Sequence, residues 1–510
     1  MVTVSGAPAM LPLDTHNQRL IANVHPAEWR NPTPAGRYNL VVIGAGTAGL
    51  VAAAGAAGLG ATVALVERDF FGGDCLNFGC VPSKALLRAA RAAADLQRAG
   101  RYGIAITQEQ VRVDFGAVME RMRRLRAELS VNDSAERMRA LGIDVFIGHA
   151  RFTAPDTVEV DGQRLRFRKA IIATGTRPAA LPVRGLAEAG YLTNESVFSL
   201  TELPRMIAVI GAGPIGCELA QAFRRLGAKV WLIEAAPRIL IREDPQAAQR
   251  VKQAMAREGV EILTGGAITA VERRAGEKFI RMTLSGESRE IAADEIVLGV
   301  GRAPAIDGLD LEAAEVAYNA AEGITIDDQL RTTNADIFAV GDAASPYKFT
   351  HVADATARLA LRNALFFGRR RASSLVVPWC VYTDPEIAHV GLGESEAQSR
   401  GLKIATLTQE LSGVDRAVLD GETDGLLKVH LVEGTDRIVG ATIVASHAGE
   451  MISELTLAIS NRIGLGAIAD VIHPYPTQVE AIKKIADAYN RGRLTPTLKR
   501  LLRAYLAWLR

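Results

Sequence analysis

The sequence predicts an α/β fold that contains two nucleotide-binding units and a third domain of a different kind. A pattern of strand, glycine turn and helix begins near residue 39 and returns around residue 211, and alternating strands follow residue 376. At 510 residues the chain is too long for one hydrophobic core. A hydrophobic content of 48% with 47 glycines suits an α/β protein that has many tight turns between strands and helices.

The first nucleotide-binding unit is an apolar strand that runs into Gly-x-Gly-x-x-Gly, at Gly44, Gly46 and Gly49. The first glycine permits a tight turn, the second lets a pyrophosphate approach the backbone, and the third packs the helix against the strand. The next strand ends in Glu67, which can accept hydrogen bonds from ribose hydroxyls. A glycine motif alone is weak evidence, but strand, glycines, helix and terminal acid together predict a dinucleotide site.

A transmembrane helix is the competing interpretation of this stretch, because no charged residue occurs from Tyr38 to Val66. Six glycines lie within it, and a strand pattern precedes them. These features favour a buried strand, turn and helix.

The same unit returns later in the chain. The residues Gly44, Gly46, Gly49, Gly60 and Glu67 have counterparts at equal spacing, which are Gly211, Gly213, Gly216, Gly227 and Glu234. The pattern Leu-Gly-Ala-x-Val-x-Leu also precedes both acids. Two Rossmann-like units and two bound dinucleotides are therefore expected.

Two thiols, Cys75 and Cys80, lie five positions apart just beyond the first unit. An ideal helix would hold their Cα atoms roughly 8 to 9 Å apart, whereas a disulfide needs about 4.4 to 6.8 Å. The helix must therefore be distorted, and Gly72, Gly73 and Gly79 supply the backbone freedom. Because a disulfide held in imposed geometry is readily reduced, the stretch predicts a catalytic dithiol.

Three other interpretations compete with the dithiol. A metal site needs about four ligands, and the only other cysteines, Cys217 and Cys380, lie far away in the sequence, so no resident metal is expected. A structural disulfide is unexpected in a large chain with four cysteines and no secretory signal, which indicates a reducing cytoplasm. Two unrelated core cysteines remain an alternative. The net charge of +2 argues against a nucleic-acid partner.

The stretch Gly-Gly-x-Cys-x4-Cys-Val-Pro-Ser-Lys from Gly72 to Lys84 resembles the active-site signature of the flavin-dependent pyridine nucleotide-disulfide oxidoreductases. The residue after the two glycines departs from the family, since Asp74 stands where members usually carry Thr. The resemblance spans roughly Tyr38 to Tyr489. It implies an α/β fold with FAD-binding and NAD(P)-binding Rossmann-like domains and a C-terminal α+β dimerisation domain, and hence a homodimer.

The resemblance also implies an electron path from a nicotinamide to FAD and then to a Cys75–Cys80 disulfide. Cys80 would lie against the flavin as the charge-transfer thiol, and Cys75 would face the substrate. Lys84 would sit near the flavin N5 and pair with Glu218, because a held cation stabilises reduced, anionic flavin.

Further cofactor-binding residues follow from the resemblance. The expected FAD ligands are Gly44, Gly46, Gly49, Glu67, Gly73, Lys84, Ala150, Thr174, Gly175, Arg302 and Asp342. The expected NAD(P) ligands are Gly211, Gly213, Gly216, Glu218, Glu234 and Gly301. A carboxylate at Glu234 would repel a 2′-phosphate, so NADH is expected to be preferred over NADPH, although Arg238 and Arg242 lie close enough in sequence to soften this choice.

The expected domain boundaries follow the motifs. Residues 1–36 are expected to be an irregular extension, residues 37–190 and 304–375 the FAD domain, and residues 191–303 the NAD(P) domain. Residues 376–490 are expected to form the dimerisation domain. The strands within 167–178 and 294–304 would mark the crossings between the two nucleotide domains.

The stretch from His473 to Glu480 indicates which class of substrate the enzyme reduces. Disulfide-reducing members end with His-Pro-Thr-x-x-Glu, in which the His protonates the leaving thiol and the Glu orients it. Counting back from Glu480, Tyr475 occupies the base position and His473 is displaced by two. A tyrosine there is similar to mercuric reductase, but this chain has no cysteine after Cys380 to match the C-terminal pair of that enzyme, and no N-terminal metal-binding domain.

Residues 491–510 are expected to form a basic amphipathic helix. Its apolar residues fall at helical spacing, which are Leu498, Leu501, Leu502, Tyr505 and Leu509. Such a helix could lie on a membrane surface, but we favour its packing on the protein's own surface.

The sequence thus predicts an enzyme that reduces a metal ion or small disulfide. The alternatives are a peripheral NADH:quinone or dye reductase and a non-enzymatic flavin-carrying redox subunit.

Overall fold

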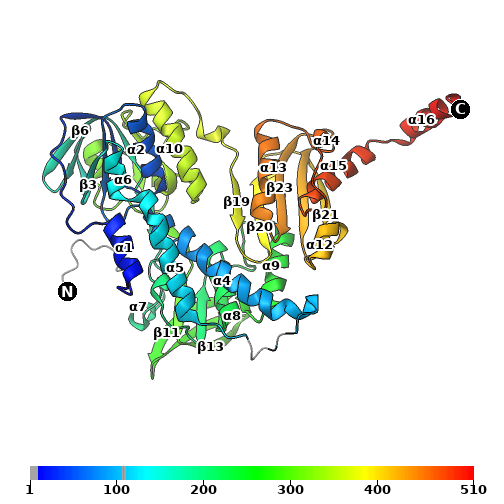
Figure 1. The fold of residues 1–510 in the computed structure, drawn as a ribbon, viewed down its shortest axis with the longest axis horizontal. Coiled ribbons are helices and arrows are strands. Elements are labelled where there is room, and N and C mark those ends of the chain that lie inside the picture. Colours follow the sequence, from blue (N-terminus) through cyan, green and yellow to red (C-terminus); the bar gives the residue numbers. More distant parts are fainter. Residues whose placement is uncertain (1–9, 106, 108–110) are drawn as a thin grey trace. The chain divides into compact units, whose positions relative to one another are not determined.

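The computed structural model describes residues 10–105, 107 and 111–510 (Figure 1). They fall into two compact units, one of residues up to 235 together with 259–374, and one of residues 236–258 together with 375–510. This division puts the helix α9 (Pro245–Arg257) in the second unit, whereas we expected residues 191–303 to form one nucleotide domain.

The first unit contains a seven-stranded sheet with a parallel centre. Its strands are β1 (Arg37–Ile43), β2 (Val63–Glu67), β3 (Asp144–Ile147), β4 (Ala150–Ala154), β5 (Thr157–Val160), β6 (Gln163–Ile172) and β18 (Ile337–Ala339), and the order is β3-β2-β1-β6-β5-β4 with β18 also paired to β6. The last four residues of β1 are buried, as expected for a parallel strand covered on both faces. The helices α2 (Thr47–Gly58) and α10 (Thr350–Leu365) pack against each other beside this sheet.

A second parallel sheet in the same unit repeats this plan. Its strands are β8 (Met206–Ile210), β9 (Lys229–Glu234), β10 (Glu261–Thr264) and β14 (Glu295–Leu298), in the order β10-β9-β8-β14, and the helix α8 (Pro214–Leu226) follows β8. The expected second Rossmann-like unit is therefore present. The crossing segments between the two sheets contain β7 (Thr176–Pro178) and β15 (Arg302–Pro304), which pair antiparallel.

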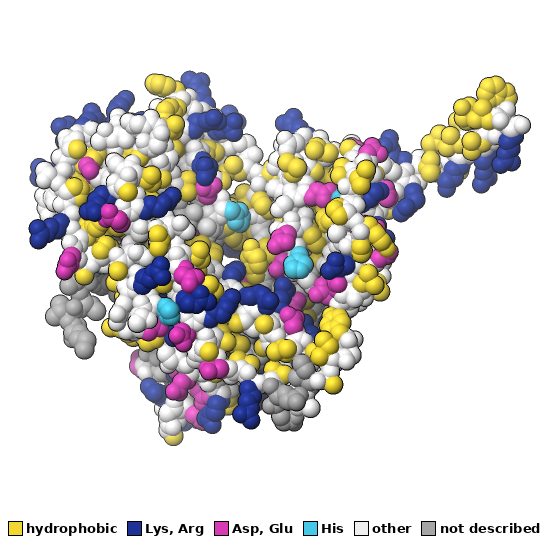
Figure 2. Space-filling view, viewed as in Figure 1, with side chains coloured by type: hydrophobic (Ala, Val, Ile, Leu, Met, Phe, Trp, Pro, Cys, Tyr) yellow, Lys and Arg dark blue, Asp and Glu magenta, His cyan; other side chains and the backbone are white. Residues whose placement is uncertain are grey.

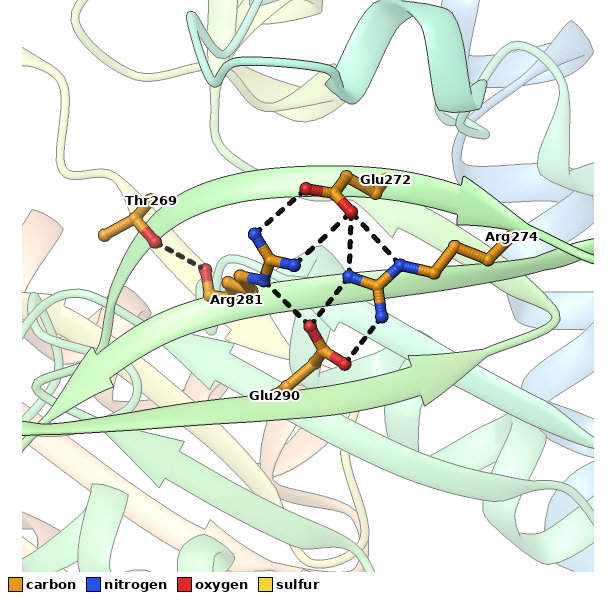
Figure 3. A network of polar contacts seen from close by, with 5 residues as sticks. All are labelled: Thr269, Glu272, Arg274, Arg281 and Glu290. Carbon is orange, nitrogen blue, oxygen red and sulfur yellow. Dashed lines mark hydrogen bonds and ion pairs between the residues drawn. The ribbon is translucent and has the colours of Figure 1, made fainter.

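The chain between β10 and β14 forms a three-stranded antiparallel sheet. It consists of β11 (Ala267–Arg274), β12 (Glu277–Leu284) and β13 (Glu287–Ala293). Figure 3 shows Arg274 and Arg281 between Glu272 and Glu290, at N–O distances of 2.7 to 3.0 Å for the closest pairs. This network faces solvent, so salt screens it and it adds little to stability.

The chain between β2 and β3 of the first sheet contains the helices α3 (Gly73–Asn77), α4 (Cys80–Arg98), α5 (Phe115–Leu129) and α6 (Ala135–Ala140). The helix α7 (Leu186–Ala189) lies between β7 and β8, where the chain passes to the second sheet. The stretch from Gly72 to Lys84, which carries both cysteines, is called the redox segment below. The helices α4 and α8 pack together, which brings this segment against the second nucleotide-binding core.

The N-terminal extension differs from the expectation. Residues 15–24 form the helix α1 (Thr15–Val24), although no periodicity predicted it. Asp14 caps the helix by accepting from the Asn17 amide, and it also forms an ion pair with Arg123 of α5. Leu20 is fully buried. Contacts with α5 therefore stabilise a helix that is too short to be stable alone.

The second unit has a five-stranded antiparallel sheet, as the alternating pattern predicted. Its strands are β19 (Pro378–Val381), β20 (Glu386–Gly391), β21 (Ile404–Glu410), β22 (Leu426–Val432) and β23 (Ile438–Ala445), in the order β19-β20-β23-β22-β21. Its helices are α11 (Glu394–Ser399), α12 (Asp415–Leu419), α13 (Ala448–Ser460), α14 (Leu465–Ile468), α15 (Glu480–Gly492) and α16 (Pro496–Trp508). Cys380 is half-buried against the core of this unit.

The helix α16 contains no buried residue. The packing of its apolar stripe on the protein's own surface, which we favoured from the sequence, is therefore not observed. Among the described residues, no helix is long and apolar enough to cross a membrane.

Candidate active site

The two glycine turns have the same geometry. Gly44 and Gly211 have φ values of +99° and +97°, which side chains rarely tolerate. A Cβ added to Gly49 would lie 1.8 Å from the Gly44 carbonyl oxygen, and one added to Gly216 would lie 1.8 Å from the Gly211 carbonyl oxygen. Each helix can therefore begin tightly against its strand, which is what the motif requires.

The terminal acids of the two units also occupy equivalent positions. A carboxylate oxygen of Glu67 accepts from the Ala45 amide at 2.6 Å, and one of Glu234 accepts from the Ala212 amide at 2.7 Å. Burial raises the pKa of Glu67 to about 7. Each acid thus lies beside its glycine turn, where a ribose would be bound.

The ends of the two turns have main-chain donors that no side chain satisfies. Gly46 and Gly213 are the N-caps of α2 and α8, and neither helix has a side-chain cap. A Cβ added to Gly213 would meet no atom within 4 Å, so the backbone there is open to a phosphate group. The redox segment approaches the first turn closely, because a Cβ on Gly73 would lie 2.7 Å from the Gly46 Cα.

The polar residues beyond the first turn fit a flavin dinucleotide. The Thr174 hydroxyl is buried and has no hydrogen-bond partner among the residues that the structure describes. Asp342 accepts from the Thr176 hydroxyl at 3.1 Å, and burial raises the pKa of its carboxyl. A buried hydroxyl without a partner and a buried carboxylate suit the hydroxyls of a ribityl chain. Of the other expected ligands, Ala150 is buried at the start of β4, and Gly175 and Gly301 have positive φ values.

The helix is interrupted between the two cysteines, as their spacing predicted. Cys75 lies in α3, Cys80 opens α4, and two residues separate these helices. Gly72 and Gly73 have φ values of +82° and +56°. A Cβ on Gly79 would lie 2.8 Å from a carboxylate oxygen of Asp74. The glycines are therefore needed for this backbone path.

Both cysteines of the pair are free thiols in this structure. The hydrogen bond from Cys75, helped by Thr350 and by the charge of Lys84, lowers the pKa of Cys80 to about 6. The Thr350 hydroxyl lies 3.3 Å from the Cys80 sulfur. The same bond to Cys80, together with burial, raises the pKa of Cys75. At neutral pH the pair therefore carries its negative charge on Cys80.

The expected contact between Lys84 and Glu218 is present. The Lys84 ammonium on α4 lies 2.9 Å from a carboxylate oxygen of Glu218 on α8. Only 5% of the Glu218 side chain is exposed, whereas 37% of the Lys84 side chain is. The buried acid thus anchors a cation that retains an open side, one helical turn after Cys80.

Asp74 is the centre of a network that sequence reasoning missed. Its carboxylate lies 3.0 Å from the Arg302 guanidinium and accepts from the Asn194 side chain at 2.7 Å. Arg302 also donates to the Thr176 hydroxyl at 2.7 Å, and Thr176 donates to Asp342. The charge of Asp74 is therefore largely compensated, which weakens the attraction that this carboxylate would exert on a cationic substrate.

The base-position residue Tyr475 has a partner that the sequence did not indicate. Its side chain is exposed, and its hydroxyl donates to Asp415 at 2.9 Å. This bond raises the pKa of Tyr475 above its ordinary value. Glu480, the expected partner of the base position, opens α15 and lies 3.6 Å from Lys484.

The ring of His473 has its own hydrogen-bond partners. One ring nitrogen lies 3.1 Å from a carboxylate oxygen of Glu454, and the other lies 3.1 Å from the Val471 carbonyl oxygen. Both ring nitrogens thus face acceptors. Because Asp415 and Glu454 are distant in sequence from the residues they hold, only the tertiary structure reveals them.

No group of three or more His, Cys, Asp or Glu side chains that could hold a metal ion occurs within residues 10–105, 107 and 111–510. The dithiol supplies two soft sulfur ligands. Thiolates are ligands for soft metal ions.

The family models that match the chain cover nearly all of its core. The model described as pyridine nucleotide-disulphide oxidoreductase matches residues 38–357. The model of the dimerisation domain of pyridine nucleotide-disulphide oxidoreductases matches residues 377–486.

Individual relatives include enzymes of two activities. A mercuric reductase of Bacillus cereus is 34% identical over 448 residues, which cover 88% of this chain and 70% of the relative. A mercuric reductase of Shigella flexneri is 35% identical over 475 residues, which cover 90% and 82%. A dihydrolipoyl dehydrogenase of Chlamydia muridarum is 32% identical over 449 residues, which cover 87% and 95%.

Solved structures share the same fold. The Cu(II) complex of the HOCl-induced flavoprotein disulfide reductase RclA from Escherichia coli has a TM-score of 0.78 at 27% identity, over 88% of this chain and 99% of that chain. LpdA from Mycobacterium tuberculosis has a TM-score of 0.80 at 25% identity, with the same coverage.

Proposed function

Because the chain belongs to the pyridine nucleotide-disulphide oxidoreductase family, we propose that it is a homodimeric, FAD-dependent oxidoreductase that passes electrons from NADH through Cys75 and Cys80 to a metal ion. FAD, when bound, supplies the transfer of two electrons from the reduced nicotinamide to the protein. The match to the family's dimerisation domain supports the homodimer. We place the enzyme in the cytoplasm, where thiols are kept reduced.

Cys80 is the thiol that faces the flavin in this proposal, and Cys75 is the thiol that meets the substrate. The low pKa of Cys80 supports this assignment, because the hydrogen bond from Cys75 and the charge of Lys84 favour its thiolate. Lys84 stabilises negative charge beside the flavin, and the buried Glu218 holds it in place.

NADH is the proposed electron donor. Glu234 accepts from the Ala212 amide, which holds its carboxylate beside the glycine turn, where a carboxylate favours a ribose hydroxyl and opposes a 2′-phosphate. Of the two arginines that could soften this choice, Arg238 donates to main-chain carbonyls, among them those of Leu240 and Glu243. These hydrogen bonds hold the Arg238 guanidinium within its own loop.

The observation that carries the choice of a metal ion is Tyr475 in the base position. A phenol titrates near 10, and the bond to Asp415 raises the pKa of Tyr475 further. General acid–base assistance is commonly worth ~10²- to 10⁴-fold, so a disulfide, whose leaving thiol needs a proton, would be reduced poorly. A metal ion needs no such proton, and thiolates are ligands for soft metals.

The relatives support the same choice. Those most similar in sequence include mercuric reductases, and RclA forms a Cu(II) complex. Asp74 does not carry the argument, because Arg302 compensates its charge. We therefore assign the metal-ion preference to the dithiol and Tyr475.

A panel of electron acceptors tests the proposal. NADH oxidation by the FAD-loaded enzyme is measured with Hg²⁺, Cu²⁺, glutathione disulfide, lipoamide and a water-soluble quinone. Metal-ion reduction should exceed disulfide reduction by at least ~10²-fold in kcat/KM. Tyr475→His should raise disulfide reduction and lower metal-ion reduction. Efficient reduction of glutathione disulfide by the wild type, unaffected by Tyr475→Phe, would show that Tyr475 only packs and that the substrate assignment is wrong.

A second candidate is an NADH:quinone or dye reductase at a membrane surface, which the exposed amphipathic helix α16 favours. In that case electrons reach the quinone without passing through the dithiol. The quinone would be the best acceptor of the panel, and Cys75→Ser would retain turnover with it. The relatives are oxidoreductases, so the non-enzymatic alternative is set aside.

A further inference from the structure

The helix α16 separates apolar from basic side chains along its length. The apolar residues Leu498, Leu501, Leu502, Tyr505, Trp508 and Leu509 are all at least 40% exposed. They recur every three or four positions and therefore share one face. The basic residues Lys499, Arg500 and Arg503 occupy the other face, and Figure 2 shows the two kinds of side chain on opposite sides of this helix.

Local signals define α16 without help from the rest of the protein. The Thr495 hydroxyl accepts from the Leu498 amide at 3.2 Å as an N-cap, and Pro496 occupies the first turn. The helix has 13 residues, which is near the length at which an isolated helix is marginal in water. A surface that covers its apolar face would stabilise it.

The charge of residues 491–510 indicates which kind of surface would bind the helix. Six Arg and Lys residues and no Asp or Glu occur from Arg491 to Arg510. Tyr505 and Trp508, with amphipathic rings, lie on the apolar face, and such rings prefer the boundary between hydrocarbon and water. At 1.5 Å per residue the helix is about 20 Å long, too short to span a bilayer core of about 30 Å. It can therefore lie in the membrane plane.

We propose that α16 docks on membranes that contain anionic lipids, with its apolar face in the acyl boundary and its basic residues at the headgroups. This docking makes the protein a peripheral membrane protein whichever acceptor its dithiol serves. It brings the enzyme close to lipid-dissolved acceptors and alters nothing in the chemistry of Cys75 and Cys80.

Vesicle co-sedimentation of the full-length, FAD-loaded protein tests this proposal. The probes are vesicles of phosphatidylcholine alone and of phosphatidylcholine with 30% phosphatidylglycerol, in low and high salt. The wild type should bind the anionic vesicles, bind the neutral vesicles at least ~10-fold more weakly, and lose affinity in high salt. The double variant Leu501→Gln/Trp508→Gln should lose at least ~10-fold in affinity for anionic vesicles.

The matched control is Leu59→Gln. Leu59 and Leu501 are each 64% exposed, and Leu59 lies at the end of α2. This variant should bind vesicles like the wild type, and all variants should retain metal-ion turnover. Absence of binding to anionic vesicles, or equal binding by the double variant, would overturn the proposal. A change of oligomeric state in the double variant would assign the apolar face to a second copy of the chain and would also overturn it.

Discussion

Cys80 acts as the charged member of the pair because the Cys75 thiol, the Thr350 hydroxyl and the Lys84 cation all favour its thiolate. The hydrogen bond from Cys75 is the largest of these influences, followed by Thr350 and Lys84. In the flavin-loaded protein, Cys75→Ser should keep a donor beside Cys80 and show a long-wavelength charge-transfer absorption band, whereas Cys80→Ser should lack it. A band in the opposite variant would reverse the two roles.

The pH dependence of that band follows from the pKa of Cys80. Because its pKa is lowered to about 6, the thiolate is present above pH 6 and is lost as pH falls through this value. Thr350→Val removes the hydroxyl at 3.3 Å and should move the midpoint to higher pH, whereas Thr350→Ser should leave it in place. Spectrophotometric titration of Cys75→Ser in these backgrounds measures the midpoints. Identical midpoints would mean that Thr350 does not stabilise the thiolate.

Glu234 offers a residue-scale test of the nucleotide preference. Glu234→Gln removes the charge but keeps an oxygen that can accept from the Ala212 amide. Because the repulsion of a 2′-phosphate then disappears, kcat/KM for NADPH should rise relative to NADH by about 10-fold, or roughly 1.4 kcal/mol. Steady-state kinetics with both nucleotides measures the ratio. An initial preference of the wild type for NADPH would contradict the assignment.

At the scale of elements, α1 and α5 support the segment that carries Cys75. Arg126 of α5 is buried and donates to the Asn17 side chain of α1 at 2.7 Å and to the Asn77 carbonyl of α3 at 2.6 Å. The Phe71 amide donates to the Val24 carbonyl. Asn77 in turn donates to the Phe71 and Gly73 carbonyls. The N-terminal helix thus contributes to the fold of the turn that carries Cys75.

The contribution of α1 to stability can be measured at its cap. Asp14→Ala removes the cap of α1 and the ion pair with Arg123, whereas Asp114→Ala removes only the comparable cap of α5. Loss of a cap typically costs ~0.5 to 2 kcal/mol. Asp14→Ala should therefore lower the free energy of unfolding by more than Asp114→Ala in urea denaturation. Equal losses would show that the ion pair adds nothing.

The Asp14 carboxylate makes the contribution of α1 to stability dependent on pH. Burial opposes ionisation of Asp14, but the bond from the Asn17 amide and the Arg123 guanidinium together lower its pKa. A lowered folded pKa stabilises the protein above the ordinary pKa of Asp, about 4, and this gain is lost as pH falls through the folded value. The difference in stability between wild type and Asp14→Ala should therefore shrink on acidification below pH 4.

At the scale of the whole molecule, the resemblance to the family predicts that the loop of Tyr475 reaches across the dimer interface to the dithiol of the partner subunit. Mixed dimers test this arrangement. One chain carries Cys75→Ser with an intact Tyr475, and the other carries Tyr475→Phe with an intact Cys75. If the loop serves the other chain, the mixed dimer contains one complete site and should recover about half of the wild-type metal-ion turnover. Turnover no higher than that of the Tyr475→Phe homodimer would place loop and dithiol in the same chain.

The sequence by itself determined the features that depend on local backbone geometry. The paired glycine turns, their terminal acids and the break between Cys75 and Cys80 follow from which residues tolerate positive φ or close approach, and the structure shows all of them. The strands on either side of each glycine turn, the buried strands within 167–178 and 294–304, and the alternating strands of the C-terminal sheet follow from hydrophobic pattern. The family's motif also indicated the contact of Lys84 with Glu218.

Only the tertiary structure decided which side chains meet across the chain. The partners Thr350 for Cys80, Arg302 for Asp74 and Asp415 for Tyr475 come from separate elements. One sequence contains no signal for such pairs, because packing of distant elements, and not local spacing, brings the atoms together. The helix α1 escaped prediction for the same reason, since α5 supplies the contacts that stabilise it. The exposed helix α16 is the converse, because its local signals predicted the helix and only the structure showed that its apolar face is uncovered.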